Sequence, residues 1–98
     1  MNENVGKSPA ERRRAQLRFR AARRGFKEVD LVFGAFAAEF LDGLDEIELD
    51  QFEALLAAPD QEVFGWLQDK SPVPVPYDTA VYRKLKSLCA RKNPKWNV

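Results

Sequence analysis

Charge is sorted along this chain into three blocks, and this sorting limits how the chain can fold. Residues 1–27 carry nine basic and two acidic side chains, whereas residues 28–69 carry twelve acidic and no basic ones. Residues 70–98 carry seven basic and one acidic side chain, so the whole chain has a net charge of +1. Two interpretations are open: the basic ends fold onto the acidic middle, or the basic front is used against a partner.

The composition predicts a single soluble domain and excludes several kinds of enzyme. A chain of 98 residues with 45% hydrophobic and 32% charged residues suits one small globular domain. Histidine is absent, which excludes Ser-His and Cys-His catalytic arrangements and the usual zinc sites. Cys89 is the only cysteine, so no intrachain disulfide can form and a reducing compartment is expected. We therefore expect a protein that is not an enzyme.

No segment of the sequence predicts insertion into a membrane. The longest uncharged apolar stretch, residues 31–38, is too short to cross a bilayer. The first residues lack the hydrophobic segment of a secretory signal. We expect the arginine-rich front to be part of the mature fold.

Helix-start and helix-stop residues divide the chain into five predicted helices. Ser8, Pro9 and Glu11 form a capping box that starts the first helix. Asp45 and Glu48 give the same signal for the third helix. The predicted helices cover about residues 9–24, 27–42, 45–58 and 61–68, and a fifth starts near residue 78.

Apolar residues at the helical period predict how these helices pack. The second helix has a strong buried stripe that includes Val29, Phe33 and Phe36, whereas the stripe of the first helix is thin. Asp60 is predicted to cap the fourth helix, and the alternating prolines of residues 71–76 predict an extended linker. We expect an all-α fold, a compact bundle of about five short helices. Residues 9–92 would form the single domain, with flexible ends at residues 1–8 and 93–98.

The stretch that points most directly to function is residues 23–30, which we call the corner. Gly25 separates the first two helices and is expected to adopt the left-handed backbone that a side chain would penalise. Arg23 and Arg24 are expected in the last turn of the first helix, and Glu28 in the first turn of the second. Glu28 and Glu39 are predicted to lie on one side of the second helix, facing solvent or a partner. The structural alternative is that an arginine of the corner and Glu28 form an ordinary surface ion pair with no function.

Residues 24–28 read RGFKE, and this motif resembles the RGxxE motif of the SdhE-type FAD assembly factors, also called succinate dehydrogenase assembly factors. Arg23 before the motif and residues 29–30 after it extend the resemblance. The later segment from Pro59 to Leu67, which contains Trp66, resembles that family's aspartate-to-tryptophan segment. The similarity covers about residues 12–92. The longer arginine-rich front and the proline-rich linker depart from the family pattern.

The resemblance implies a chaperone that binds the flavoprotein subunit of succinate dehydrogenase, and in some bacteria that of fumarate reductase. Such proteins promote covalent attachment of FAD to a histidine of that subunit. FAD is then the cofactor of the partner, and we expect none on this chain. The implied protein is a monomer when free and does not insert into membranes. It would work in the bacterial cytoplasm or, in a eukaryote, in the mitochondrial matrix. The predicted partner-binding residues are Arg23, Arg24, Gly25, Glu28, Asp30 and Trp66.

Two other functions remain open on the sequence. The arginine-rich first helix is compatible with a nucleic-acid-binding module, although the acidic middle would repel a long duplex and we expect no nucleic-acid partner. A protein-interaction adaptor with no link to a cofactor is the second alternative. A salt-dependent shift with DNA or RNA would identify the first, and capture of a partner would separate the second from an assembly factor.

Overall fold

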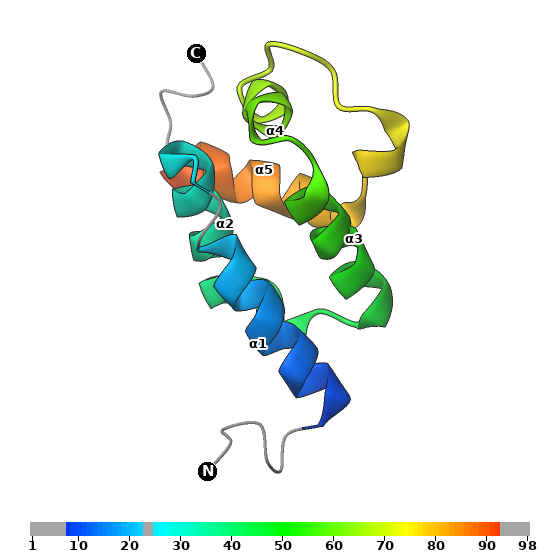
Figure 1. The fold of residues 1–98 in the computed structure, drawn as a ribbon. Coiled ribbons are helices and arrows are strands. Elements are labelled where there is room, and N and C mark those ends of the chain that lie inside the picture. Colours follow the sequence, from blue (N-terminus) through cyan, green and yellow to red (C-terminus); the bar gives the residue numbers. More distant parts are fainter. Residues whose placement is uncertain (1–7, 23–24, 93–98) are drawn as a thin grey trace.

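The computed structural model describes residues 8–22 and 25–92. Within these residues the chain forms five α-helices and two short 3-10 helices, and no strand (Figure 1). The all-α prediction is therefore confirmed. The ends predicted to be flexible fall almost wholly on residues outside the described part. The elements in chain order are α1 (Pro9–Ala21), α2 (Lys27–Phe40), η1 (Leu41–Gly43), α3 (Glu46–Ala57), α4 (Asp60–Leu67), η2 (Val75–Tyr77) and α5 (Ala80–Lys92).

The helices surround one apolar core centred on α2. This helix packs against α1, α4 and α5, and α5 also packs against α3 (Figure 1). The rings of Phe36 and Phe52 stack with centroids 5.2 Å apart, and Phe33 lies 5.8 Å from Phe52. All three side chains are fully buried, as the apolar periodicity predicts for Phe33 and Phe36 of α2 and for Phe52 of α3. Among the described helices, none has both the length and the apolar character needed to cross a membrane.

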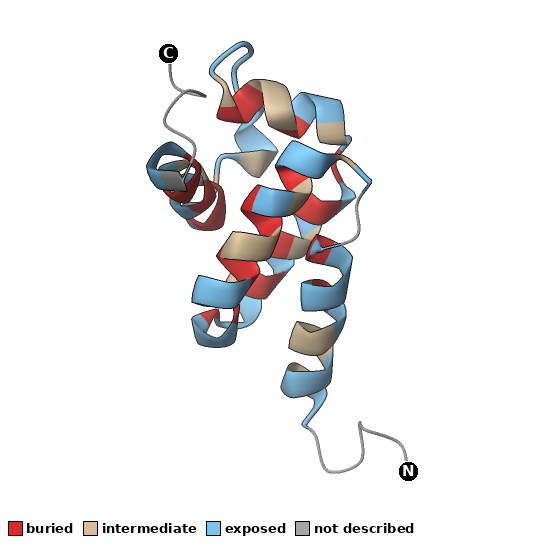
Figure 2. Cartoon of the chain, turned by 90° about the vertical axis from the view of Figure 1, so that its left-hand side faces the viewer, coloured by how far each residue is buried: buried red, intermediate tan, exposed pale blue. Residues whose placement is uncertain are grey.

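Apolar packing alone holds α1 weakly. Its buried side chains are Leu17 and Ala21, and Figure 2 shows α1 mostly in the colours of exposed and intermediate residues. The end of α1 lies at Ala21, three residues before the predicted end, and Arg23 and Arg24 lie outside the described residues. A helix with so little buried surface needs other contacts to stay in place.

Ion pairs with α3 supply those contacts. The Arg13 guanidinium donates to Glu46 at 3.4 Å, to Asp50 at 2.6 Å and to Glu53 at 2.9 Å. Hydrogen bonds to Asp50 and Glu53 raise the pKa of Arg13 above its ordinary value. Arg20 adds a bond to Glu53 at 3.3 Å. For these arginines, the interpretation that the basic front folds onto the acidic middle is confirmed.

The second helix is shorter than predicted. It ends at Phe40 instead of residue 42, and the chain tightens into the 3-10 helix η1, which the Leu44 N–H closes by donating to the Leu41 carbonyl at 3.2 Å. A 3-10 turn is a common way to finish an α-helix. It lets Leu44 enter the core while Asp45 caps α3 through the predicted capping box with Glu48.

Two predicted starts are corrected by the structure. Pro59, not Asp60, occupies the N-cap position of α4, and its carbonyl accepts the N–H of Val63 at 3.1 Å. Asp60 is instead the first residue of α4, where a carboxylate suits the positive end of the helix dipole. The fifth helix begins at Ala80, because the Thr79 hydroxyl accepts the N–H of Tyr82 at 3.2 Å and provides the cap.

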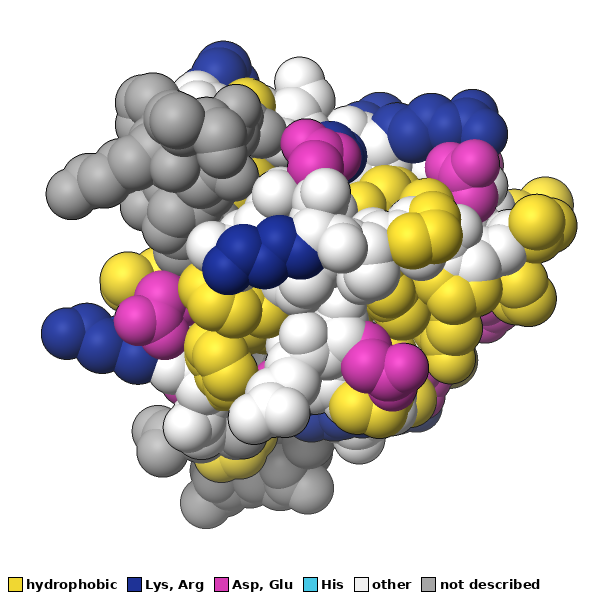
Figure 3. Space-filling model, turned by 90° about the horizontal axis from the view of Figure 1, so that it is seen from above, with side chains coloured by type: hydrophobic (Ala, Val, Ile, Leu, Met, Phe, Trp, Pro, Cys, Tyr) yellow, Lys and Arg dark blue, Asp and Glu magenta, His cyan; other side chains and the backbone are white. Residues whose placement is uncertain are grey.

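The proline-rich linker lies on the surface and is only partly extended. Residues 75–77 form the 3-10 helix η2, so the prediction of a purely extended linker is wrong at its end. The Tyr77 N–H donates to the Pro74 carbonyl at 2.9 Å, and the Tyr77 ring packs on Trp66 at 5.1 Å. Val75 is 87% exposed. In Figure 3, apolar side chains gather toward the right, the side on which the linker lies in Figure 1.

Two ionisable groups of α5 are buried in the core. Burial raises the pKa of the Tyr82 hydroxyl from its ordinary value of 10.0 to about 12. Burial likewise raises the pKa of the Cys89 thiol from 9.0 to about 11. Both side chains are at most 3% exposed, and the prediction that Cys89 is a core residue is confirmed. The folded protein therefore favours the neutral form of each group.

We expect the free energy of unfolding to fall as the pH rises above about 9. Each folded pKa lies above the unfolded one, so the stabilisation is complete below the unfolded pKa and is lost as the pH rises through the folded one. For Cys89 this window is about pH 9 to 11, and for Tyr82 about pH 10 to 12. Urea unfolding between pH 8 and 11 measures the loss. Cys89→Ala should show a weaker pH dependence, and an unchanged one would contradict this assignment.

We also expect Arg13→Ala to destabilise the fold more than the loss of an ordinary surface arginine. The change removes three ion pairs between α1 and α3, and we expect it to cost about 1 kcal/mol at low salt. Arg83→Ala is the matched control, because Arg83 is 69% exposed and, among the described residues, forms an ion pair only with the nearby Asp78. The loss of unfolding free energy in Arg83→Ala should be close to zero. Added salt should reduce the difference in unfolding free energy between the two variants, which urea titrations measure.

Candidate docking site

Gly25 sits at the corner with the backbone that was predicted for it. Its φ is +92°, in the left-handed region that favours glycine, and the residue is exposed. Apart from the glycine itself and its two neighbours in the chain, no atom of the described residues lies within 4 Å of the point where a Cβ would be. The glycine is thus required by the turn of the chain and not by crowding from its own fold. Its surface stays open to an approaching molecule.

Phe26 anchors the corner to the rest of the domain. It occupies the N-cap position of α2 with an extended backbone, and its side chain makes no capping hydrogen bond. Its half-buried ring instead packs on Phe64 of α4, with ring centroids 5.0 Å apart. The Phe26 carbonyl accepts the N–H of Asp30 at 2.8 Å. Sequence reasoning missed this role, although a large apolar residue next to a helix-ending glycine is a usable signal for an anchor.

The two acidic residues of the corner, Glu28 and Asp30, have different surroundings. Glu28 is exposed in the first turn of α2, and within the described part of the chain it makes no hydrogen bond or ion pair. Asp30 is partly buried, and its Oδ2 accepts the N–H of Gly25 at 3.3 Å. Glu28 is therefore available to a partner, whereas the Asp30 carboxylate is used inside the corner.

Of the other predicted site residues that the structure describes, Trp66 is placed less favourably for direct contact. Trp66 is only 5% exposed and packs against Tyr77, so its side chain is part of the core. Its contact with a partner remains a prediction. Arg23 and Arg24 lie outside the described residues. Glu39, which was expected to face solvent or a partner together with Glu28, accepts a hydrogen bond from Arg91 at 3.4 Å at the surface.

Leu31 extends the exposed surface along α2. It is 59% exposed and lies three residues after Glu28, on the same side of the helix. Sequence reasoning missed it, although Leu31 falls outside the buried stripe formed by Val29, Val32 and Phe33. An exposed leucine beside an unpaired carboxylate gives this face both apolar area and charge.

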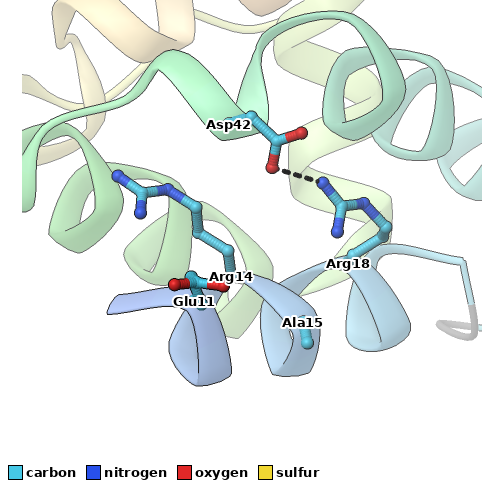
Figure 4. A pocket seen from close by; sticks show the side chains of 5 residues that line it. All are labelled: Glu11, Arg14, Ala15, Arg18 and Asp42. Atoms are coloured by element: carbon cyan, nitrogen blue, oxygen red, sulfur yellow. Dashed lines mark hydrogen bonds and ion pairs between the residues drawn. The ribbon is translucent and has the colours of Figure 1, made fainter. Parts of the chain in front are cut away.

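Arginines of α1 line a second candidate site, but their side chains already bind other parts of this chain. Residues of α1 and Asp42 of η1 line a hollow of about 160 Å³, and Figure 4 shows these side chains. Arg18 donates to Asp42 at 2.8 Å. The Nη2 of Arg14 donates to the Leu44 carbonyl at 2.6 Å, while its Nε is buried without an acceptor. The charges in this hollow compensate each other, so it does not form a strong anion site.

The described residues contain no group of three or more possible metal ligands. The described residues of the corner offer a carboxylate, a bare peptide backbone and a neighbouring leucine. Such a set can bind and orient another polypeptide.

Comparison with known proteins agrees with this chemistry. Residues 15–89 match a family described as "Flavinator of succinate dehydrogenase". The chain is 33% identical over 82 residues to succinate dehydrogenase assembly factor 2, mitochondrial, of Dictyostelium discoideum, which covers 84% of this chain and 58% of that protein. It is 31% identical over 99 residues to the protein of that name from Candida glabrata, which covers 97% of this chain and 61% of that one.

A third relative is succinate dehydrogenase assembly factor 2-B, mitochondrial, of Drosophila ananassae, which is 32% identical over 80 residues. The match covers 80% of this chain and 49% of that protein. The chain thus spans about half the length of the curated relatives it matches. The family match extends over well more than half of the chain and includes the corner. The chain belongs to the family of succinate dehydrogenase assembly factors known as flavinators.

Proposed function

We propose that this chain binds the flavoprotein subunit of succinate dehydrogenase and promotes covalent attachment of FAD to it, with the corresponding subunit of fumarate reductase as a further client. The observation that carries the proposal is the exposed pair of Gly25 and Glu28 at the corner. Within the described residues, neither the Glu28 carboxylate nor the space beside the Gly25 Cα is used by the fold itself. Both groups are free to contact a partner.

The two residues suit different parts of an interface. The Glu28 carboxylate can accept a charge-assisted hydrogen bond from an arginine or lysine of the partner, which fixes orientation. Gly25 lets the partner's backbone approach closely because no side chain intervenes. A stable complex needs roughly 800 Å² on each side, more than the corner itself provides. The exposed face of α2 around Leu31 adds apolar area next to it.

Binding alone is sufficient for the proposed effect. The chain contains no histidine, so the acceptor of the flavin bond belongs to the partner. A protein that holds the flavoprotein subunit with its own reacting groups aligned accelerates the step by positioning. We therefore propose a chaperone without turnover of its own, monomeric when free. We propose that it acts where its client is assembled, in the mitochondrial matrix or the bacterial cytoplasm.

The nucleic-acid alternative receives less support. It depended on the arginines of the first helix. Four of these already donate hydrogen bonds to other parts of this chain, namely Arg13, Arg14, Arg18 and Arg20. Breaking these contacts to bind phosphates would weaken the attachment of α1 to the rest of the domain.

The direct test is co-expression with the flavoprotein subunit of the same organism's succinate dehydrogenase. We expect flavin fluorescence of that subunit on a denaturing gel to rise when this chain is present, because only covalently held flavin survives denaturation. The subunit expressed alone is the control. Equal fluorescence with and without the chain, at equal amounts of subunit, would overturn the proposal.

A matched pair of variants tests the role of Glu28. We expect Glu28→Gln to weaken binding to the flavoprotein subunit about tenfold or more, since it removes a charged acceptor. Glu62→Gln is the control, because Glu62 is also exposed in the first turn of a helix but lies on α4. Both variants should keep the wild-type unfolding free energy within about 0.5 kcal/mol. Equal affinities in a titration would show that Glu28 is not a contact.

A further inference from the structure

We infer that Asp30 and Phe26 are positioning residues, which hold residues 25–28 of the corner in the shape that presents Gly25 and Glu28 to a partner. This inference rests on the proposed function and deepens it. It also gives Asp30 a different role from the direct partner contact predicted from the sequence. Two independent sets of contacts carry it, one in the backbone of the corner and one between α2 and α4.

The first set closes the backbone of the corner from both sides. The Asp30 side chain accepts the N–H of Gly25 at 3.3 Å, and the Asp30 N–H donates to the carbonyl of Phe26 at 2.8 Å. One residue in the first turns of α2 thus holds both ends of the Gly25–Phe26 pair, the N–H of the first residue and the carbonyl of the second. Glycine has the widest conformational freedom of any residue, so this turn needs outside restraint to keep one shape.

The second set fixes where α2 begins. Phe26 is the residue immediately before α2, and its ring packs at 5.0 Å on Phe64. Phe64 lies on α4, which also carries the buried Trp66. The ring contact therefore ties the first turn of α2, and with it the direction of Glu28, to a second helix of the core.

These restraints matter for binding because an ordered site loses less entropy when the partner arrives. If the corner sampled many shapes, the complex would form only from the fraction with the correct one, and the apparent affinity would fall by that fraction. Loss of one restraining hydrogen bond is expected to lower affinity roughly fivefold to tenfold. The fold as a whole should remain intact, since the corner lies at the edge of the core.

The test compares Asp30→Ala with Asp30→Asn. The asparagine keeps a carbonyl oxygen that can accept the Gly25 N–H, whereas alanine has no acceptor. We expect Asp30→Ala to speed solvent exchange of the Gly25 amide roughly fivefold to tenfold and to weaken binding to the flavoprotein subunit by a similar factor. Asp30→Asn should stay close to wild type in both measurements. If both variants lose affinity equally while Gly25 exchange is unchanged, Asp30 is a direct charged contact and the inference is wrong.

A second pair of variants tests the anchor. Phe26→Leu keeps an apolar side chain against Phe64, and we expect it to bind the flavoprotein subunit within about twofold of wild type. Phe26→Ala removes the contact, and we expect faster Gly25 exchange and roughly tenfold weaker binding. Denaturant unfolding of each variant separates this effect from a general loss of stability. Unchanged exchange and binding in a folded Phe26→Ala variant would overturn the role of the anchor.

The two proposals fail in different ways. If wild-type protein does not bind the flavoprotein subunit at all, the proposed function is wrong. The amide-exchange measurements on the free protein still decide whether Asp30 and Phe26 hold the corner. If wild-type protein binds and the alanine variants bind equally well, the function stands and the positioning role falls.

Discussion

The bonds from the Arg13 guanidinium to the carboxylates of α3 are the contacts on which the attachment of the first helix to the rest of the domain depends. The first helix buries little apolar surface of its own, so its position relative to α3 depends on charge. An exposed ion pair is usually worth little, but three acceptors on one half-buried guanidinium form a network. The sorted charges of the sequence thus have a structural purpose before any partner is involved.

The sequence predicts most of this fold because local signals and the apolar period agree. The capping boxes at Ser8 and Asp45 and the buried stripe of α2 are found where they were predicted. The errors occur at helix ends. Asp60 looks like a cap by residue type, but the extended backbone of Pro59 takes that position. The 3-10 helices η1 and η2 depend on packing of Leu44 and Tyr77 into the core, which no local pattern reports.

The candidate site is predictable in part. The left-handed Gly25 and the exposed Glu28 follow from helix-terminus chemistry and from the motif that carries the family resemblance. What the motif cannot give is which side chain faces outward and which turns back. Asp30 and Glu28 are chemically alike and two residues apart, so they lie on different sides of the first turns. Phe26 was missed because its partner, Phe64, lies 38 positions away in the sequence and only the tertiary fold brings them together.

The surface linker before α5 has a consequence for how this small protein behaves at high concentration. Its valines are exposed or half-exposed, and such residues in an extended segment are usually a nucleus for strand pairing between molecules. Here a proline precedes and follows each of them, so every second residue of the segment lacks an N–H group. A neighbouring strand would find only half of the donors that a β-ladder needs. The linker can therefore display apolar side chains at little risk of self-association through the backbone.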